Sequence, residues 1–545
     1  MGEERADSLR EADSLAAQPQ PVFTSWADSV LASLSLEEKA GQLLMPWILG
    51  DFSPEGSSSH EETLEMVENL GLGGFIVSVG SPTEVAVKLN RLQADSKLPL
   101  LVAADLERAA GFRFRGIVYL PGPIALGGAT EFPSLMAVGA TGDERLARTM
   151  GEVTGFEARA LGVHVPFAPV LDVNNNPDNP IINIRSFGED PNDVARLGSA
   201  FVMGLQDADG IATGKHFPGH GDTDTDSHLD LPIIDVTRER MDSVELVPFQ
   251  AVIDAGIGGI MTAHLSIPAI TEDRNTPATL SPSVLTGLLK EEMGFDGLIF
   301  TDAMDMYAID RRHSREEAAV RALEAGADVL LMPPDPEAAR DGIVAAVEEG
   351  RLPTERLDRS VLKILQAKES LGLDRNRQVS IEDVAKKVGI QKHQDAAQEV
   401  ADRSVTLLKN EGGLLPLLGT RSARVLSVTY RGTTDLLAGR VFNAGLRARY
   451  PRLATGVLNR DTPGDIHQGL LARARRSDLV VVSLFVTIVS YSGTVALPEE
   501  MSGFIQALAQ EKIPHVVISF GNPYLLKEFP DVRSYMLAWS GAGVS

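Results

Sequence analysis

GIATGKHFPGHGDTDTDSHLDLP, residues 210–232, is the stretch from which the rest of the chain can be interpreted. Its first residues are small or apolar and indicate a buried strand, whereas the Gly, Pro, Asp, Thr and Ser that follow exclude a regular helix. The loop holds three histidines and four aspartates. In a barrel of alternating strands and helices, a loop at the carboxyl end of a strand lies on the face where active sites are built. We therefore expect a functional site here.

A calcium site in this loop would require ligands that the sequence does not supply. Asp222, Asp224 and Asp226 alternate as in an EF-hand, but the sixth position is Ser227 instead of glycine. The twelfth position is Ile233, which cannot provide the bidentate carboxylate. The spacing therefore disfavours calcium.

A zinc pair formed by His216 and His220 has the right separation but the wrong local structure. Pro218 and Gly219 lie between them and break the helix that would align both rings on one face. No glutamate follows His216, as the helical zinc motif of metalloproteases would require. Zinc is therefore disfavoured as well, and we predict no metal and no other cofactor.

A proton-transfer pair is the interpretation that the spacing favours. Asp226 and His228 are two residues apart, and in an extended loop such residues point to the same side. The carboxylate can then hold and polarise the imidazole. A polar loop whose side chains only bond one another is the plain alternative, but it does not explain the clustering of histidines.

Short apolar runs recur along the first part of the chain, with helical patterns between them. We expect strands within residues 43–45, 74–79, 98–104, 164–170, 210–214, 258–263, 297–301 and 329–332. Eight such runs alternating with helices predict an α/β fold, a (β/α)₈ barrel of the TIM type.

Ionisable residues stand directly after five of these runs. A charge at a barrel rim is unfavourable unless a partner or a ligand uses it, so the set indicates function. Because the carboxyl ends of parallel strands share one mouth, we expect these side chains to converge: Asp105, Asp172, Lys215, His216, His264 and Asp302.

Length and composition limit the class of protein. With 545 residues, 43% of them hydrophobic, the chain can build more than one globular core. The net charge of -25 argues against nucleic acid or an anionic membrane as a partner. Cysteine is absent, which excludes disulfides, thiolate zinc sites and a cysteine nucleophile. No apolar run is long enough to span a membrane, and residues 1–21 do not form a signal peptide.

Composition also divides the chain. We predict a disordered tail over 1–22, a catalytic barrel over 23–373, a polar linker over 374–394 and an α/β sandwich domain over 395–545. Residues 395–409 have an amphipathic helical pattern. Strand-like runs at 425–429, 479–484, 515–520 and 535–539 alternate with helices and predict an open, mostly parallel sheet. The chain stops directly after the last of these runs, which indicates a truncated C-terminus.

The order of residues in the opening loop resembles a family signature. Lys215 to Gly221, followed by Asp226-Ser227-His228 and Leu231-Pro232, is similar to the motif of glycoside hydrolase family 3, in its β-N-acetylglucosaminidase branch. The resemblance implies that His228 is the general acid/base, oriented by Asp226. It also implies that Lys215 and His216 hold the sugar.

Asp302 lies in GLIFTDAMDM, residues 297–306, which resembles the nucleophile segment of the same family. The resemblance implies that Asp302 attacks the anomeric carbon. On spacing alone, Asp302 could instead cap the next helix. The chain departs from the family at Ala303, where a second aspartate is common, so a neighbouring polar contact is in doubt.

Two further segments carry the resemblance. Arg185, in an Arg-Ser-Phe-Gly sequence, has a guanidinium suited to holding sugar hydroxyls or an acetamido oxygen; its alternative is an ion pair with Glu189 or Asp190. Asp105 and Arg113 match the family's aspartate and the arginine eight residues on. Arg108 and Ala109 replace the usual glycine pair, so the assignment of Arg113 is the weaker one.

The resemblance implies a retaining exo-β-N-acetylglucosaminidase that acts on peptidoglycan fragments, muropeptides or chitooligosaccharides. Members of this family occur on both sides of the inner membrane; because residues 1–21 do not form a signal peptide, we expect a cytoplasmic protein, with a periplasmic or secreted one as the alternative. A histidine acid/base does not repel an anionic acceptor, so a phosphorylase stays open as an alternative. A family 3 β-glucosidase would draw its acid from the second domain, where Glu499 and Glu500 are available. An inactive sugar-binding protein is the remaining class, and the oligomeric state is left open.

Overall fold

The computed structural model describes residues 25–119, 123–125, 127–225, 230–271, 273–417, 420–486 and 495–541. The tail expected to be disordered, 1–22, lies outside these ranges, as do Asp226 and His228. Within the described ranges, no helix is both long and apolar enough to cross a bilayer.

Seven of the eight apolar runs contain a strand, and the run 210–214 holds only the first two residues of one, which continues through Lys215 and His216. The strands are β1 (Leu44–Met45), β3 (Gly74–Ser78), β4 (Leu101–Ala104), β7 (Val165–Pro166), β8 (Thr213–Phe217), β9 (Gly259–Thr262), β10 (Leu298–Phe300) and β11 (Leu330–Leu331). Their residues are buried on both faces, which is typical of parallel strands covered by helices. The pattern missed β2 (Trp47–Leu49), in which the middle residue alone is buried.

These strands pair in parallel throughout. They form a four-stranded sheet in the order β2-β3-β4-β7, a three-stranded sheet β10-β9-β8 and a pair β1-β11. Backbone bonds join neighbouring sheets: Leu171 N donates to Lys215 O over 2.6 Å, and Thr301 N donates to Val329 O over 3.0 Å. The α/β class is therefore correct, and closure of all eight strands into one barrel stays a prediction.

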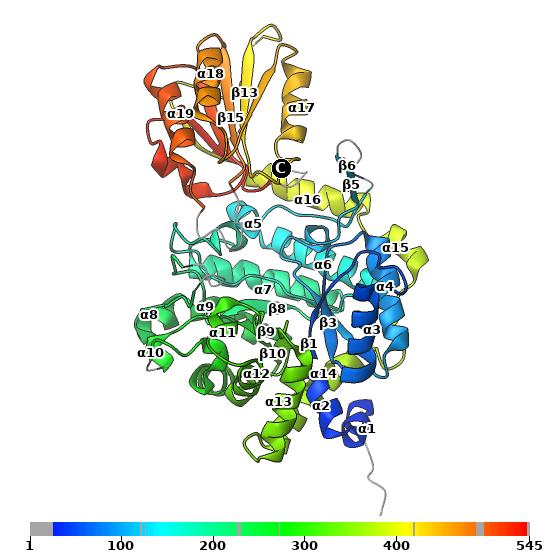
Figure 1. Cartoon of the computed structure of the whole chain (residues 1–545). Coiled ribbons are helices and arrows are strands. Elements are labelled where there is room, and N and C mark those ends of the chain that lie inside the picture. Colours follow the sequence, from blue (N-terminus) through cyan, green and yellow to red (C-terminus); the bar gives the residue numbers. More distant parts are fainter. Residues whose placement is uncertain are drawn as a thin grey trace, which may run out of the picture.

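Helices cover the outside of these strands (Figure 1). They include α2 (Leu36–Gln42), α3 (Ser58–Leu70), α4 (Pro82–Asp95), α6 (Glu144–Leu161), α7 (Pro191–Asp207), α9 (Leu246–Asp254), α12 (Arg315–Ala325), α13 (Pro336–Glu348) and α14 (Thr354–Ser370). Their starts follow local chemistry. Ser35 and Glu38 form a capping box at α2, and Asp190 caps α7 with Pro191 as its first residue.

The region predicted as a linker is part of the first hydrophobic core. It contains α15 (Ile381–Lys387), and α16 (Gln391–Ser404) packs against α5 (Leu135–Thr141) and α6. Val384 and Val400 belong to the same core cluster as the strands of the first domain. The two cores therefore divide after α16. The helix predicted to reach residue 409 ends at Ser404, because the chain turns into an edge strand, β12 (Thr406–Asn410).

The second domain is built on a six-stranded sheet in the order β12-β17-β16-β15-β13-β14. Its strands are β12, β13 (Val425–Tyr430), β14 (Ala454–Leu458), β15 (Leu479–Leu484), β16 (His515–Ser519) and β17 (Ser534–Leu537). Only the β12-β17 pairing is antiparallel, so the prediction of a mostly parallel sheet is confirmed. Helices α17 (Arg440–Arg449), α18 (Gly464–Ala474) and α19 (Glu499–Gln510) flank it.

The second domain lies against the side of the first domain that carries α5 and α16 (Figure 1). Hydrogen bonds join the two: Ser134 Oγ donates to the Trp539 carbonyl over 2.9 Å. The Tyr524 hydroxyl accepts from Asn174 Nδ2 at 2.9 Å and donates to Glu189 Oε1 at 2.6 Å. Because Asn174 follows the strand β7, the second domain is held next to the carboxyl ends of the first domain's strands.

Candidate active site

A cavity of about 1160 Å³ opens at these strand ends. The first domain lines it with charged and imidazole side chains: Asp105, Glu107, Arg113, Arg185, Lys215, His216, His220 and Asp302. The second domain supplies a largely apolar wall that includes Leu437, Val441, Phe442, Phe485 and Phe520. The predicted convergence of strand-end residues on one mouth is therefore confirmed for Asp105, Lys215, His216 and Asp302. It is wrong for Asp172 and His264, which are fully buried and do not line the cavity.

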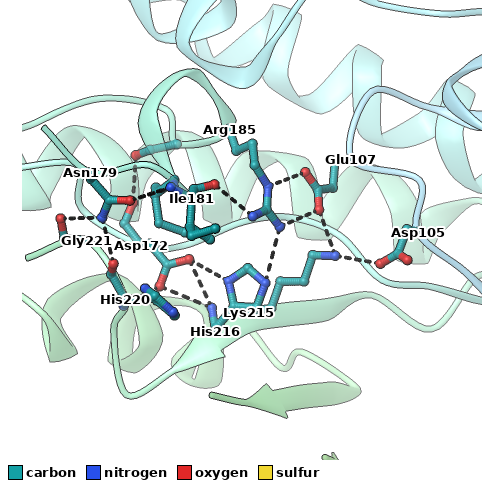
Figure 2. Close-up of polar contacts among 12 residues, drawn as sticks. Asp105, Glu107, Asp172, Asn179, Ile181, Arg185, Lys215, His216, His220 and Gly221 are labelled. Atoms are coloured by element: carbon teal, nitrogen blue, oxygen red, sulfur yellow. Dashed lines mark hydrogen bonds and ion pairs between the residues drawn. The ribbon is translucent and has the colours of Figure 1, made fainter. Parts of the chain in front are cut away.

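Glu107 is the centre of the charged cluster (Figure 2). Its carboxylate accepts from Arg185 Nε at 2.9 Å and Nη2 at 2.8 Å, and lies 2.8 Å from Lys215 Nζ. Lys215 Nζ also donates to Asp105 Oδ1 over 2.8 Å, and Arg113 Nη2 reaches Asp105 Oδ2 at 3.2 Å. Alternating charges thus fix the side chains of five residues at one end of the cavity.

Mutual attraction in this cluster outweighs the effect of burial. Burial would raise the pKa of Glu107, but Arg185 and Lys215 hold it well below its usual value. Burial would lower the pKa of Lys215, but Asp105 and Glu107 raise it above its usual value. Glu107 and Lys215 are therefore charged at neutral pH and present a fixed acceptor and a fixed donor to the cavity.

Asp172 anchors the loop after β8. It is fully buried, and its Oδ2 lies 2.7 Å from His216 Nδ1. The backbone amides of His216 and His220 also donate to it, at 3.2 and 2.7 Å. Since His216 Nε2 faces Arg185 Nη2 at 3.3 Å, we assign the proton of His216 to Nδ1 and the acceptor role to Nε2. Burial opposes ionisation of Asp172, but His216 and His220 lower its pKa.

Asp302 follows β10 and points its half-buried carboxylate at the same cavity. Its Oδ1 accepts from the amide of Ala303 over 2.8 Å. Burial opposes its ionisation, but His216 and His264 lower its pKa, so the carboxylate stays charged at neutral pH. The helix-cap alternative is wrong, because the next helix, α11 (Tyr307–Asp310), has Met306 as its N-cap.

The structure also decides the alternatives for Arg185. Glu189 accepts from Tyr524 and Asp190 caps α7, so neither pairs with Arg185, which binds Glu107 instead. Arg113, the weaker assignment, does lie at the cavity. The remaining predicted site residues, Asp226 and His228, lie outside the described part of the chain.

The metal interpretations gain no support. Both ring nitrogens of His216 already have partners, Asp172 and Arg185, so a zinc pair with His220 would have to displace them. Among the described residues, no group of three or more His, Asp or Glu side chains is placed to hold a metal ion.

Two residues of the site were not singled out from the sequence. Glu107 lies two positions after Asp105, a spacing that places both at one strand end, and this was an available signal. Gly221 is required by packing, because a Cβ at this position would lie 1.7 Å from the Val173 carbonyl oxygen. The loop can therefore cross the chain after β7 only with glycine there.

Comparison with known proteins assigns the class. Residues 35–367, more than half of the chain, match the family described as "Glycosyl hydrolase family 3 N terminal domain". The fold, the charged cavity and this match together define a glycoside hydrolase. The chain belongs to family 3 of these enzymes.

Particular relatives span nearly the whole chain. A "Beta-N-acetylglucosaminidase/beta-glucosidase" of Cellulomonas fimi is 30% identical over 95% of this chain and 92% of its own. The structure of a family 3 β-N-acetylglucosaminidase from Paenibacillus sp. str. FPU-7 is 32% identical, with a TM-score of 0.80 over 94% of this chain and 95% of that one. "Beta-glucoside phosphorylase BglX bound to 2FGlc" is 27% identical, with a TM-score of 0.83 over 97% and 94%.

Proposed function

We propose that this glycoside hydrolase is a retaining exo-β-N-acetylglucosaminidase on a closed (β/α)₈ barrel. It would remove terminal, non-reducing β-linked N-acetylglucosamine from peptidoglycan fragments or chitooligosaccharides. The observation that carries the proposal is a charged aspartate, Asp302, in one cavity with the Glu107-centred cluster. The names of the Cellulomonas and Paenibacillus relatives support the acetamido sugar.

The charged cluster supplies the sugar-binding groups. Lys215 and Arg185 donate in fixed directions, and Asp105 accepts, so hydroxyl groups of one terminal sugar can bond to all three. Because the side chains are already held by one another, little ordering remains when the sugar binds. A terminal sugar fixed in this way is the requirement for exo-action.

The reaction would proceed in two displacements. Asp302 attacks the anomeric carbon as the bond to the leaving oxygen breaks, and His228, oriented by Asp226, protonates that oxygen. The neutral imidazole then takes a proton from water, whose oxygen displaces Asp302 from the anomeric carbon. Two inversions retain the configuration. The lowered pKa of Asp302 keeps the nucleophile ionised throughout the neutral range.

Phosphorolysis is a second candidate, and one observation favours it. A solved structure titled as a β-glucoside phosphorylase matches 97% of this chain with a TM-score of 0.83. In that case phosphate replaces water in the second displacement, and the neutral imidazole of His228 does not repel it. The product would be a sugar 1-phosphate instead of the free sugar.

The β-glucosidase alternative requires an acid from the second domain. Glu499 and Glu500 are exposed at the start of α19 and are not among the described residues that line the cavity. The second-domain carboxylate that does line it is Asp435, whose Oδ1 accepts from the amide of Ala438. Asp435→Asn and Glu499→Gln are therefore the control variants for this rival.

The deciding experiment compares nitrophenyl β-N-acetylglucosaminide with the β-glucoside, with and without phosphate. We expect the acetamido substrate to be preferred and its cleavage to be lost in His228→Ala and in Asp302→Gly. Added azide should restore turnover in Asp302→Gly, and the product should be an α-glycosyl azide. The two control variants should retain wild-type activity. Preference for the glucoside, or loss of activity in Asp435→Asn, would refute the proposal; a sugar phosphate product would convert it to the phosphorylase.

A further inference from the structure

The imidazole of His220 has no hydrogen-bond partner in the described part of the chain, although it is 2% exposed. Neither Nδ1 nor Nε2 is bonded, and both atoms are inaccessible to bulk water. The backbone of the same residue is fully used: its amide donates to Asp172 at 2.7 Å and its carbonyl accepts from Asn179 Nδ2 at 2.9 Å. The backbone of His220 is therefore fixed, while the polar atoms of its ring remain unused.

Such an arrangement is unfavourable for folding. A buried donor or acceptor without a partner costs about 1–3 kcal/mol relative to the same group in water. Buried polar groups are nearly always paired, so each exception requires a reason. The neighbouring His216 shows the ordinary outcome, with both ring nitrogens engaged.

The location of the ring supplies that reason. His220 lines the cavity together with Asp302 and Lys215, and its ring meets the ring of His216 edge-on, with centroids 6.2 Å apart. Figure 2 shows it beside Asp172 and His216, with no interaction drawn from its ring to the residues around it. His220 therefore belongs to the wall of the cavity in which the sugar would bind, and a turn of its ring would present one of the covered nitrogens to it.

We propose that His220 is a substrate-contacting residue whose imidazole forms a hydrogen bond with a hydroxyl group of the terminal sugar. The inference rests on the proposed function, since it takes a sugar as the occupant of the cavity. A neutral imidazole carries one N–H donor and one acceptor nitrogen, and a hydroxyl is both donor and acceptor. Either tautomer can therefore make the bond.

The charge state of the ring fits this role. Burial lowers the pKa of His220 to about 4, although Asp172 and Asp302 act in the opposite direction. The imidazole is neutral through the working range of a neutral glycosidase. It therefore positions the sugar, and it does not exchange protons with it.

The test replaces the imidazole with a slightly larger aromatic ring that has no polar atoms. His220→Phe should lower kcat/KM by roughly 10- to 100-fold, as loss of a substrate hydrogen bond does. Its Tm should stay the same or rise, because no protein hydrogen bond is removed and an unpaired buried polar group is eliminated. The shape of the pH profile should not change. A structural histidine would give the reverse: a lower Tm with little change in kcat/KM.

His164→Phe is the matched control. This imidazole is also buried, but it lies before β7, at the opposite end of the strands, and its Nδ1 accepts from the Val102 amide at 3.0 Å. We expect a lower Tm and an unchanged KM, since Val102 loses its acceptor. If His220→Phe behaves like His164→Phe, the inference is overturned.

A substrate series identifies the hydroxyl. Nitrophenyl glycosides lacking one hydroxyl at a time are assayed on the wild type and on His220→Phe. The loss of kcat/KM caused by removing a hydroxyl and the loss caused by His220→Phe should be non-additive for one hydroxyl and additive for the others. Additivity for every hydroxyl would overturn the inference. The series is built on whichever β-glycoside the wild type cleaves. Preference for glucosides would therefore defeat the proposed function and leave the test of His220 intact.

Discussion

Glu107→Gln is the substitution for which the structure gives the clearest magnitude. The change keeps the shape of the side chain, removes one negative charge and places an amide N–H₂ against the cations that the carboxylate now binds. Glu107 is 6% exposed and accepts from Arg185 twice, at 2.9 and 2.8 Å, and contacts Lys215 at 2.8 Å. Removing one charge of a buried ion pair lowers the free energy of unfolding by about 3–5 kcal/mol.

Two compensations move the expected value to the lower end of that range. Lys215 keeps Asp105 at 2.8 Å, and the glutamine oxygen still accepts one bond from Arg185. We therefore expect the free energy of unfolding to fall by about 3 kcal/mol. Both cations that are proposed to hold the sugar lose one of the contacts that position them, and a displacement of about 1 Å would lower kcat/KM by about 100-fold.

Urea denaturation and steady-state kinetics measure the two effects separately. The unfolding midpoint should fall with an unchanged m-value, and kcat/KM should fall under the same buffer conditions. Glu131→Gln is the control, because Glu131 also pairs with two arginines, Arg108 and Arg115, but at the more exposed rim. It should change stability by less than about 1 kcal/mol. A loss below 1 kcal/mol for Glu107→Gln, with kcat/KM within threefold of the wild type, would show that the cluster does not organise the site.

Three further substitutions test other parts of the molecule. Lys368 is fully buried, and its Nζ donates to Gln42 Oε1. Burial lowers the pKa of Lys368 from 10.5 to about 7. Between these two pH values the unfolded chain therefore binds a proton that the folded chain lacks. The free energy of unfolding therefore falls as the pH drops from 10.5 to 7. We expect Lys368→Met to raise the free energy of unfolding by a few kcal/mol at about pH 7 and below, but only slightly near pH 10, as measured by urea denaturation. Tyr524→Phe removes two hydrogen bonds between the domains and should lower the free energy of unfolding by about 1–3 kcal/mol. An unchanged midpoint of urea unfolding would contradict this expectation. Gly221→Ala drives a Cβ to 1.7 Å from the Val173 oxygen, so we expect a destabilisation of about 3 kcal/mol and loss of activity; a Tm equal to that of the wild type would show that the loop can move.

The periodic part of the fold could be predicted from the sequence, because buried parallel strands are apolar on both faces. All eight runs in the first domain and all four in the second overlap a strand, although β8 extends three residues beyond its run and β14 was not predicted. The strand β2 alternates in burial and is only three residues long, so it gave no run to detect. The strand β12 continued an amphipathic helical pattern, and its conformation is set by pairing with β17, more than 100 residues away. Non-local pairing of this kind leaves no local signal.

The site could be predicted as a set of strand-end residues, but not as a network. Asp105, Lys215 and Asp302 were identified because each follows an apolar run. Glu107 gains its importance from Arg185 and Lys215, which lie 78 and 108 positions further along the chain, and no spacing rule connects them. The predicted ion pairs of Arg185 with Glu189 or Asp190 were wrong for the same reason, because the sequence indicates partners that are near in the chain and not partners that are near in space.

The walls of the cavity belong to separate hydrophobic cores. Asp302 and the Glu107 cluster stand on the core of the first domain, whereas Phe442, Phe485 and Phe520 belong to a cluster built on the six-stranded sheet of the second. A substitution that repacks the aromatic wall alters the space opposite Asp302 and the Glu107 cluster, and the strain it introduces falls on the second core. Inherited variation in the second core can therefore reshape the cavity while the charged groups on the first core keep their positions, so the two walls can evolve separately.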